Sequence, residues 1–339
     1  MTQHGTATPA SLAGRMADVA RRQMLLGELL LREDEGGLVE WPFPTMHQCL
    51  GPIRPGTVHI VAARPSNGKT TLMMNTFQSW LDQGKTVLYL GMEMPPEELR
   101  LQWAAWKAGY DFKLVINRQW SQLPLGARDQ IAKQLDVQMD PTIVNRAIFA
   151  DEERVTLADL NIWMTRAAEL KVDVVVIDHL HRMDVGGMGL SDHAAMAEAI
   201  TTIKSLSKHY NIPFVVAAQV GRPELRDALT AYIPPTLESL RQSGKIEEEA
   251  DVVLGLSRAL KPGVKDGDLK LVRLGMKPLH DIADRGTMAV RVLKHRLDGD
   301  QIGRDLHLYV HKNQLYDDRL ARDQAHLVTI CAPNVPMGG

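Results

Sequence analysis

Residues 63–70 read Ala-Arg-Pro-Ser-Asn-Gly-Lys-Thr (ARPSNGKT). An apolar run at Thr57–Ala62 precedes this segment, and a helical pattern from Thr70 to about Gln83 follows it. Together they match the Walker A pattern G-x-x-x-x-G-K-S/T, with Ala63 in place of the first glycine. In such a loop, successive backbone N–H groups and the amino end of the helix bind phosphate oxygens. The alternative is a chance glycine turn, which GKTT in this context disfavours.

Two side chains of this loop are expected to act directly on a nucleoside triphosphate. Lys69 would reach the β- and γ-phosphates, and the Thr70 hydroxyl would bind Mg²⁺. The predicted cofactors are therefore ATP and Mg²⁺. The residues expected to contact the nucleotide are Ala63, Arg64, Pro65, Ser66, Asn67, Gly68, Lys69, Thr70 and Thr71.

Three polar residues end apolar strands and are expected at the same edge of the sheet. Asp178 ends VDVVVID, Glu93 follows the strand at Thr86–Leu90, and Gln219 ends PFVVAAQ. We expect Asp178 to hold Mg²⁺ through water, as a Walker B aspartate does, rather than to cap a helix. Glu93 can polarise the attacking water, and a surface glutamate before a helix is an equal alternative. The amide of Gln219 can sense the γ-phosphate.

His179 and His181 follow Asp178 directly. A zinc site is conceivable, but two histidines at i and i+2 share one side of an extended segment without a third ligand. We expect them to face the edge of the site or to pack locally.

The remaining apolar runs predict an α/β fold. They contain no polar alternation, which is typical of strands buried on both faces of a parallel sheet. Helical patterns separate them, so repeated β-α-β units with helices covering the sheet are expected. The further strands are predicted at Val172–Ile177, Pro213–Ala218, Asp251–Leu256 and Met288–Lys294.

The composition limits the classes of partner. The 339 residues carry a net charge of −2 and are 45% hydrophobic, so any surface for nucleic acid must be a local patch. The two cysteines, Cys49 and Cys331, are too few and too far apart for a disulfide framework. Neither a signal peptide nor a run of about 18 apolar residues is present. A cytoplasmic protein without a membrane span is therefore expected.

Three regions are predicted along the chain. Residues 1–35 form an N-terminal arm with an amphipathic helix, which either packs on its own domain or docks on a neighbouring subunit. Residues 36–320 form the ATPase domain, and residues 321–339 a weakly structured tail. Residues 34–44, with two glycines and two prolines, indicate a linker.

The motifs, taken in order, resemble the C-terminal ATPase domain of DnaB-type replicative helicases. The resemblance covers about residues 36–318 and implies a RecA-like P-loop core with a mainly parallel sheet flanked by helices. It extends to the alanine that opens the phosphate loop, although the two histidines stand where a Tyr and a Gln are usual. The stretches that carry it are ARPSNGKTT, MEMP, VVVIDHLHRM, FVVAAQVGR, LRQSGKIEEEADVVLGLSR and the Lys294-His295-Arg296 triplet.

This resemblance implies roles that the residues alone do not establish. Glu93 is implied as the catalytic base, and Gln219 as the link between nucleotide state and the DNA loops. Arg241, Gln242 and Gly244 match a loop that tracks a single-stranded DNA backbone, with Gln242 in place of the usual Glu. From the residues alone, this segment is a helix start preceding solvated charge.

Lys294 and Arg296 match the finger that reaches the γ-phosphate of the next subunit. Alternate residues of a strand share a side, so the two should lie on one face. The resemblance implies a ring, by analogy a hexamer, with active sites shared between subunits. Without it, the triplet indicates an exposed edge strand with alternating basic residues.

The function expected is therefore an ATP-dependent DNA helicase that translocates on single-stranded DNA. A RecA-like recombination ATPase without unwinding activity, or a regulatory P-loop ATPase that binds no nucleic acid, are the alternatives. Only about 35 residues precede the core, where full-length DnaB proteins have a helical domain. A loader or primase is a possible partner, and this departure puts the usual contacts in doubt. Residues 259–287 are expected as a family-specific insertion.

Overall fold

The computed structural model describes residues 38–150, 152, 154–186, 192–220, 235–258, 287–312 and 314–318. The predicted arm (1–35), the predicted tail (321–339) and the segment 259–286 lie outside these ranges. The chain divides into two units, Met1–Leu38 and Val39–Gly339, and the fold below is that of the second.

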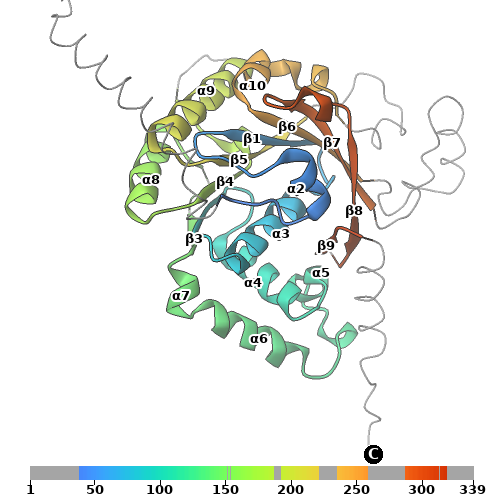
Figure 1. Ribbon diagram of the computed structural model, residues 1–339. Coiled ribbons are helices and arrows are strands. Elements are labelled where there is room, and N and C mark those ends of the chain that lie inside the picture. The colour runs from blue at the N-terminus through green and yellow to red at the C-terminus, as the bar shows by residue number, and fades with distance from the viewer. Residues whose placement is uncertain are drawn as a thin grey trace, which may run out of the picture. The chain divides into compact units, whose positions relative to one another are not determined.

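Nine strands in the described residues form one sheet (Figure 1). They are β1 (Val58–Ala63), β2 (Val87–Gly91), β3 (Ala147–Ala150), β4 (Val174–Asp178), β5 (Phe214–Gln219), β6 (Val252–Arg258), β7 (Thr287–His295), β8 (Asp305–His311) and β9 (Gln314–Tyr316). Their order is β3-β2-β4-β5-β1-β6-β7-β8-β9. The first six are parallel, and β7, β8 and β9 add antiparallel strands on one side. The predicted α/β class with a mainly parallel sheet is confirmed.

Helix α2 precedes the first strand, and the other helices lie between the parallel strands along the chain. They are α2 (Pro44–Leu50), α3 (Lys69–Asp82), α4 (Pro96–Lys107), α5 (Phe112–Ile116), α6 (Ala127–Gln138), α7 (Pro141–Val144), α8 (Leu157–Glu169), α9 (Asp192–Tyr210) and α10 (Gly244–Glu249). Their starts follow local chemistry: Thr156 and Asp159 form a reciprocal capping box at α8, and Pro96 occupies the first turn of α4. None of the helices in the described ranges has both the length and the apolar character that crossing a bilayer requires.

The sheet separates two apolar layers, which explains the absence of polar alternation in its strands. On β1, Val61 and Ala63 pack into the layer of α2, α3 and α4, whereas Val58, Ile60 and Ala62 pack into the layer of α8, α9 and α10. Figure 1 shows these helices on opposite sides of the sheet. All six residues of β1 are buried, so the loop that follows it is attached to a rigid support.

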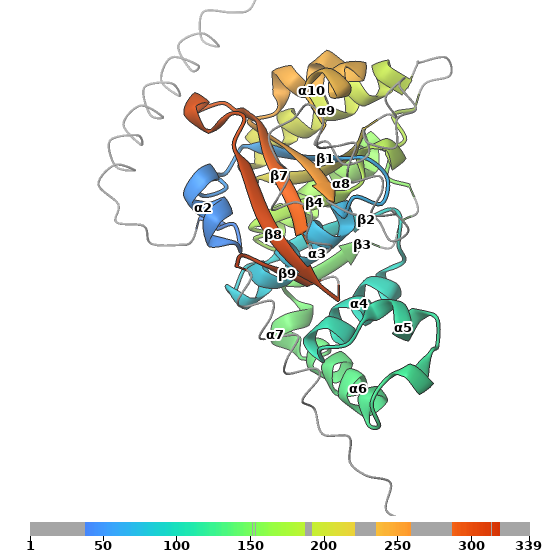
Figure 2. The same cartoon turned by 90° about the vertical axis from the view of Figure 1, so that its right-hand side faces the viewer.

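The six predicted strands correspond to β1, β2, β4, β5, β6 and β7, with ends that differ by at most two residues. Two local interpretations change. The described part of the expected linker contributes to the core, because Val39, Trp41 and Phe43 are buried. The edge-strand alternative for the triplet 294–296 changes in part: β7 lies between β6 and β8, which Figure 2 shows beside it, but β8 pairs only with Thr287–Arg291, whereas Lys294 and His295 pair with β6.

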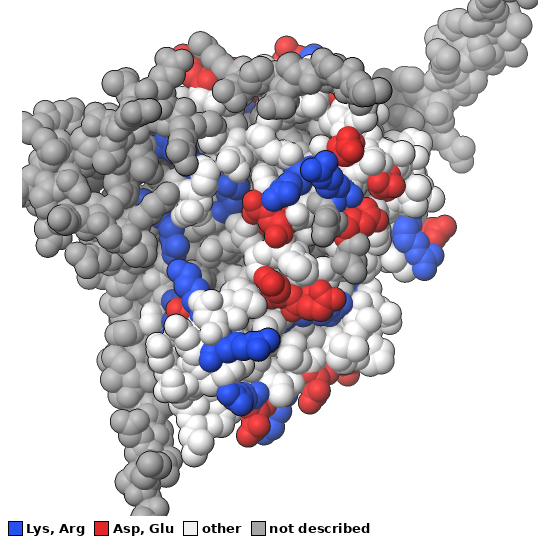
Figure 3. Space-filling model, turned by 180° about the vertical axis from the view of Figure 1, so that it is seen from behind, with Lys and Arg blue, Asp and Glu red and all other residues white. Residues whose placement is uncertain are grey.

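Charge is not concentrated on the face shown in Figure 3. Basic and acidic side chains are interspersed there among the described residues. This agrees with the small net charge of −2 and restricts any nucleic-acid contact to a local surface.

Candidate active site

The loop between β1 and α3 has the backbone geometry of a phosphate-binding turn. Ser66 and Gly68 both have left-handed φ values, of 62° and 89°. A Cβ added at Gly68 would overlap Cε of Met288, the end of a flexible side chain that can shift, so the left-handed backbone is the main reason for glycine at this position. Helix α3 begins immediately afterwards at Lys69, so the free backbone N–H groups of its first turn point at this loop.

Lys69 is held within the site. Its side chain is largely buried, and Nζ donates to the carbonyl oxygen of Ala63 at a distance of 3.3 Å. Burial lowers the pKa of the ammonium group, and the nearby carboxylates of Asp178 and Glu93 partly oppose that shift. The ammonium therefore lies among the acidic groups that the sequence predicts as its partners.

Asp178 ends β4 and is buried. Tyr89 donates to its Oδ2 atom at 3.0 Å, whereas Oδ1 has no hydrogen-bond partner of ordinary geometry. Burial raises the pKa of this carboxyl group to about 6, although the hydroxyl groups of Thr70 and Tyr89 act in the opposite direction and lower it. A carboxylate oxygen without a partner beside a threonine hydroxyl fits a hard cation such as Mg²⁺, which binds few protein oxygens and keeps several waters.

Glu93 follows β2 and is partly exposed. Its Oε1 atom lies 3.4 Å from Nδ1 of the buried His179. Ligand atoms of Glu93, Asp178 and His179 all lie within 4.8 Å of one another. The Glu93 carboxylate thus stands beside the expected metal position, where an attacking water could be oriented.

The two histidines contact different residues. His179 contacts Glu93, whereas Nδ1 of His181 accepts a hydrogen bond from the backbone N–H of Gln219 at 3.3 Å. Their rings are 5.7 Å apart. They lie at the edge of the site, as the sequence predicts. The zinc alternative gains no support, because His181 is not part of the cluster formed by Glu93, Asp178 and His179.

Lys69 and Glu93 line a cavity of about 710 Å³, whereas Asp178, His179 and His181 are not among its lining residues. Several predicted residues line it: Pro65, Ser66, Gly68, Lys69, Thr70, Thr71, Glu93 and Gln219. The sequence reasoning missed a second set, formed by Gln102 of α4, by Phe112, Lys113 and Ile116 of α5, and by Arg258 at the end of β6. The signal for Arg258 was available, because it ends an apolar strand just as Gln219 does.

Comparison with known proteins agrees with this geometry. The profile for the DnaB-like helicase C terminal domain matches residues 39–298. The chain belongs to this family. The replicative DNA helicase DnaB of Mycoplasma pneumoniae (strain ATCC 29342 / M129 / Subtype 1) is 28% identical over 254 residues, which are 71% of this chain and 49% of the relative. That of Helicobacter pylori (strain J99 / ATCC 700824) is 28% identical over 222 residues, 65% of this chain and 43% of the relative.

Solved structures show the same fold. An ATPase domain solved on its own matches with a TM-score of 0.69 at 16% identity, over 88% of this chain and 98% of that one. A DnaB-like replicative helicase studied with its primase interactions matches with a TM-score of 0.67 at 15% identity, over 86% and 66%. The chain spans about half the length of the curated relatives that it matches.

The segment that resembles the DnaB-type DNA loop is helical. A 3₁₀ helix at Glu238–Ser243 carries Arg241 and Gln242 and continues into α10 at Gly244. The backbone of Gly244 is right-handed helical, and a Cβ there would meet open space. Locally this is the helix start that the residues alone predict, and the DNA contact stays a prediction.

Lys294 and Arg296 lie at the sheet edge opposite the phosphate loop. His295 pairs with Val252, which in turn pairs with His59 at the beginning of β1, whereas the loop follows the end of β1. Six residues of strand separate the two edges by roughly 20 Å. Both cations contact the carboxyl end of α10, so they share a face as predicted. Neither can reach the nucleotide site of its own chain.

Proposed function

We propose that this chain is the motor domain of a DnaB-type replicative helicase. It would form a homo-hexameric ring, translocate on single-stranded DNA and unwind duplex with ATP hydrolysed at subunit interfaces. One observation carries the proposal: the phosphate loop and its acids occupy one edge of the sheet, while the basic pair Lys294 and Arg296 occupies the other. A site divided in this way is complete only where two chains meet.

Within one chain, the proposed division of labour follows the geometry. Lys69 would neutralise the β- and γ-phosphates, and backbone N–H groups of residues 66–70 would bind their oxygens. Thr70 and Asp178 would hold Mg²⁺, which supplies charge neutralisation at the phosphates when bound. Glu93 would orient the water for in-line attack, and Gln219 would sense the γ-phosphate from the end of β5.

The second chain would supply the remaining charge. Arg296, with Lys294 beside it, would approach the γ-phosphate from the open side of the neighbour's site. An arginine supplied in trans contributes about 10³–10⁵ in rate to phosphoryl transfer. This makes ring assembly a condition for turnover.

Single-stranded DNA is the proposed polymer, with Arg241, Gln242 and Gly244 as the contacting residues. A cationic residue and backbone N–H groups bind phosphates without reading bases, which suits a motor that must move over any sequence. A loader or primase is a further proposed partner, by analogy with the DnaB-like helicase whose primase interactions have been studied.

Steady-state ATPase assays with and without single-stranded DNA, together with unwinding of a forked duplex, test this function. We expect DNA to stimulate hydrolysis and the fork to open, with the Lys69→Ala chain inactive in both assays. Stimulation without unwinding would instead identify a recombination-type ATPase. ATPase activity that ignores DNA would contradict the helicase proposal and favour a regulatory ATPase.

A further inference from the structure

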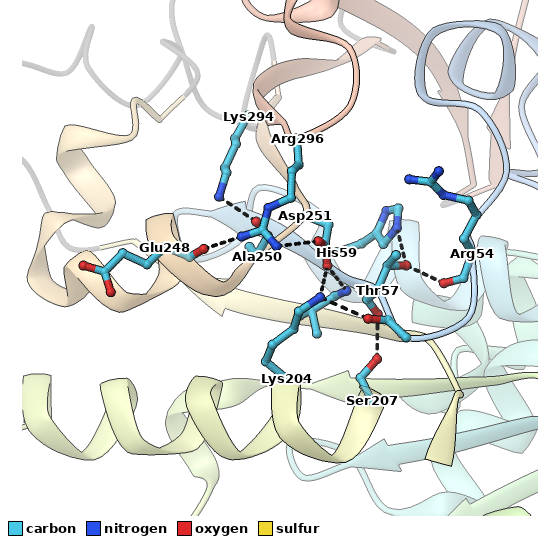
Figure 4. Close-up of polar contacts among 12 residues, drawn as sticks. Arg54, Thr57, His59, Lys204, Ser207, Glu248, Ala250, Asp251, Lys294 and Arg296 are labelled. Atoms are coloured by element: carbon cyan, nitrogen blue, oxygen red, sulfur yellow. Dashed lines mark hydrogen bonds and ion pairs between the residues drawn. The ribbon is translucent and has the colours of Figure 1, made fainter. Parts of the chain in front are cut away.

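Asp251 lies at the junction between α10 and β6, and its oxygen atoms accept four hydrogen bonds. Figure 4 shows the side chains around it. Its Oδ2 atom accepts from Nζ of Lys204 at 2.5 Å and from the backbone N–H of Val58 at 2.8 Å. Its Oδ1 atom accepts from the Arg296 guanidinium at 3.0 Å, and its backbone oxygen accepts from the Arg296 N–H at 2.8 Å. The Asp251 side chain is only 12% exposed, so it is a fixed point rather than a mobile surface carboxylate.

The carboxyl end of α10 completes this support. Arg296 donates a second side-chain hydrogen bond to the carbonyl oxygen of Glu248 at 2.5 Å, and Lys294 donates to the carbonyl oxygens of Glu247 and Ala250. These carbonyls lie at and just beyond the negative end of the helix, where they have no helical partners and favour cations. Both members of the basic pair are thus held from the same side.

Among the residues that the structure describes, this support leaves part of the guanidinium free for another ligand. Only two of its five N–H donors are used by Asp251 and Glu248, and the Arg296 side chain is 42% exposed. Arg296 and Asp251 also line a cavity of about 370 Å³, which gives an incoming anionic group room beside the finger. A free arginine side chain loses rotamer freedom when it is immobilised, so a finger fixed beforehand loses less when it meets a phosphate.

We propose that Asp251 is a positioning residue for hydrolysis at the neighbouring subunit's site: it holds Arg296 in the orientation in which the guanidinium meets the neighbour's γ-phosphate. The proposal rests on the trans role of Arg296 argued above. Asp251 touches no nucleotide in this scheme and acts only through the arginine. Burial opposes ionisation of Asp251, but the hydrogen bonds from Lys204 and Val58 and the charges of Lys204 and Arg296 keep its pKa below the ordinary value.

A double-mutant cycle on the assembled full chain tests this. ATPase rates are measured at saturating ATP and single-stranded DNA for wild type, Asp251→Asn, Arg296→Ala and the double variant. We expect Asp251→Asn to lower kcat about 10- to 100-fold with little change in KM, because a displacement of about 1 Å can cost 100-fold. In the Arg296→Ala background, the same substitution should cause no further loss. A purely structural role would make the two losses multiply.

The control is Asp305→Asn, which breaks the ion pair with Arg291 on β7 and β8 and should leave kcat unchanged. Ring assembly and thermal unfolding are recorded for every variant. Should Asp251→Asn fail to fold, Asp251→Glu keeps the charge facing Lys204 while displacing the carboxylate, and it should lower kcat in the same Arg296-dependent way.

The outcomes distinguish failure of the positioning role of Asp251 from failure of the trans role of Arg296. Wild-type kcat in folded Asp251 variants, a rise in kcat, or a loss that persists in full without Arg296 would overturn the positioning role. If Arg296→Ala itself leaves kcat unchanged in assembled rings, the trans finger fails, and the positioning role fails with it.

Discussion

An equimolar mixture of Lys69→Ala and Arg296→Ala chains should hydrolyse ATP faster than either preparation alone. The reason is the distance within one chain: Arg296 lies roughly 20 Å from its own phosphate loop, at the opposite end of β1. Each variant therefore damages a different half of the proposed shared site. Where an Arg296→Ala chain offers its intact Lys69 to the intact finger of a Lys69→Ala neighbour, one complete site forms.

The size of the effect follows from counting interfaces. In randomly mixed rings about one quarter of the interfaces unite two intact halves, because each half is intact with a probability of about one half. Loss of the finger alone leaves about one thousandth of the activity, taking the lower limit for an arginine in trans. The mixture should thus reach up to a quarter of wild-type activity, about 250-fold above the Arg296→Ala chain alone, when the sites act independently.

Steady-state phosphate release after subunit exchange measures this, with formation of mixed rings verified by subunits that carry distinguishable tags. The matched control mixes Lys69→Ala with Glu93→Gln. Both changes damage the same half of the site, so no interface regains a complete set and no activity should return. If mixed rings form and show no ATPase above the mean of their parts, in single turnover as well as at steady state, the shared-site model is wrong.

Three further predictions concern single positions. Gly68→Ala should lower ATP affinity about 10- to 100-fold in a fluorescent-nucleotide titration, because the left-handed backbone strains any residue with a side chain and Cε of Met288 must also shift. Near-normal binding would contradict the loop geometry. Arg241→Ala should weaken single-stranded DNA equally for all sequences and reduce the salt slope by about 1, whereas a sequence-selective loss would refute a backbone contact. Burial lowers the pKa of His59 from 6.5 to about 3, so between these values the unfolded chain binds a proton that the native chain does not. The free energy of unfolding should therefore fall by about 1.4 kcal/mol per pH unit on acidification below 6.5, and urea titrations of His59→Gln should show that this part of the slope is lost.

Three residues of the candidate site could be predicted from sequence because Asp178 and Gln219 end buried parallel strands and Glu93 follows one. The apolar runs that end at Asp178 and Gln219 have the length and composition of such strands, and strands of one direction bring their carboxyl ends to the same edge. No long-range information was needed. The same reasoning could have found Arg258, which ends β6 and lines the same cavity.

Three elements of the structure were missed in the sequence for different reasons. Strand β3, Ala147–Ala150, has only four residues, too few for a periodic signal. Strand β8, by contrast, alternates Leu306, Leu308 and Val310 with polar residues, a pattern of one buried face that could have been recognised. Helix α5 lines the cavity and packs against α4, and packing of that kind has no local signature.

The basic pair shows where sequence reasoning stops. Alternation alone places Lys294 and Arg296 on one face, and the structure agrees. That this face meets the end of α10 depends on the register of β6 against β7, which shifts between Val253 and Leu254. A register is set by contacts between strands far apart in sequence, so the support offered by Asp251 could not be derived from the local pattern.

The proposed division of the site between two sheet edges, if Arg296 acts in trans, also restricts how chains can assemble. A two-fold dimer uses one self-complementary patch on both partners, and such a patch would have to contain both the phosphate loop and Arg296 to complete two sites. The two edges are separated by roughly 20 Å of buried strand and face opposite ends of the sheet, so they belong to different patches. The interface must then be heterologous, with the Lys69 edge of one chain against the Arg296 edge of the next. Repeating a heterologous contact closes a ring or continues as a helix, and in either form each added chain completes one further site. Activity should accordingly rise with assembly beyond the dimer, and a stable two-fold dimer with full ATPase activity would contradict the placement of the finger.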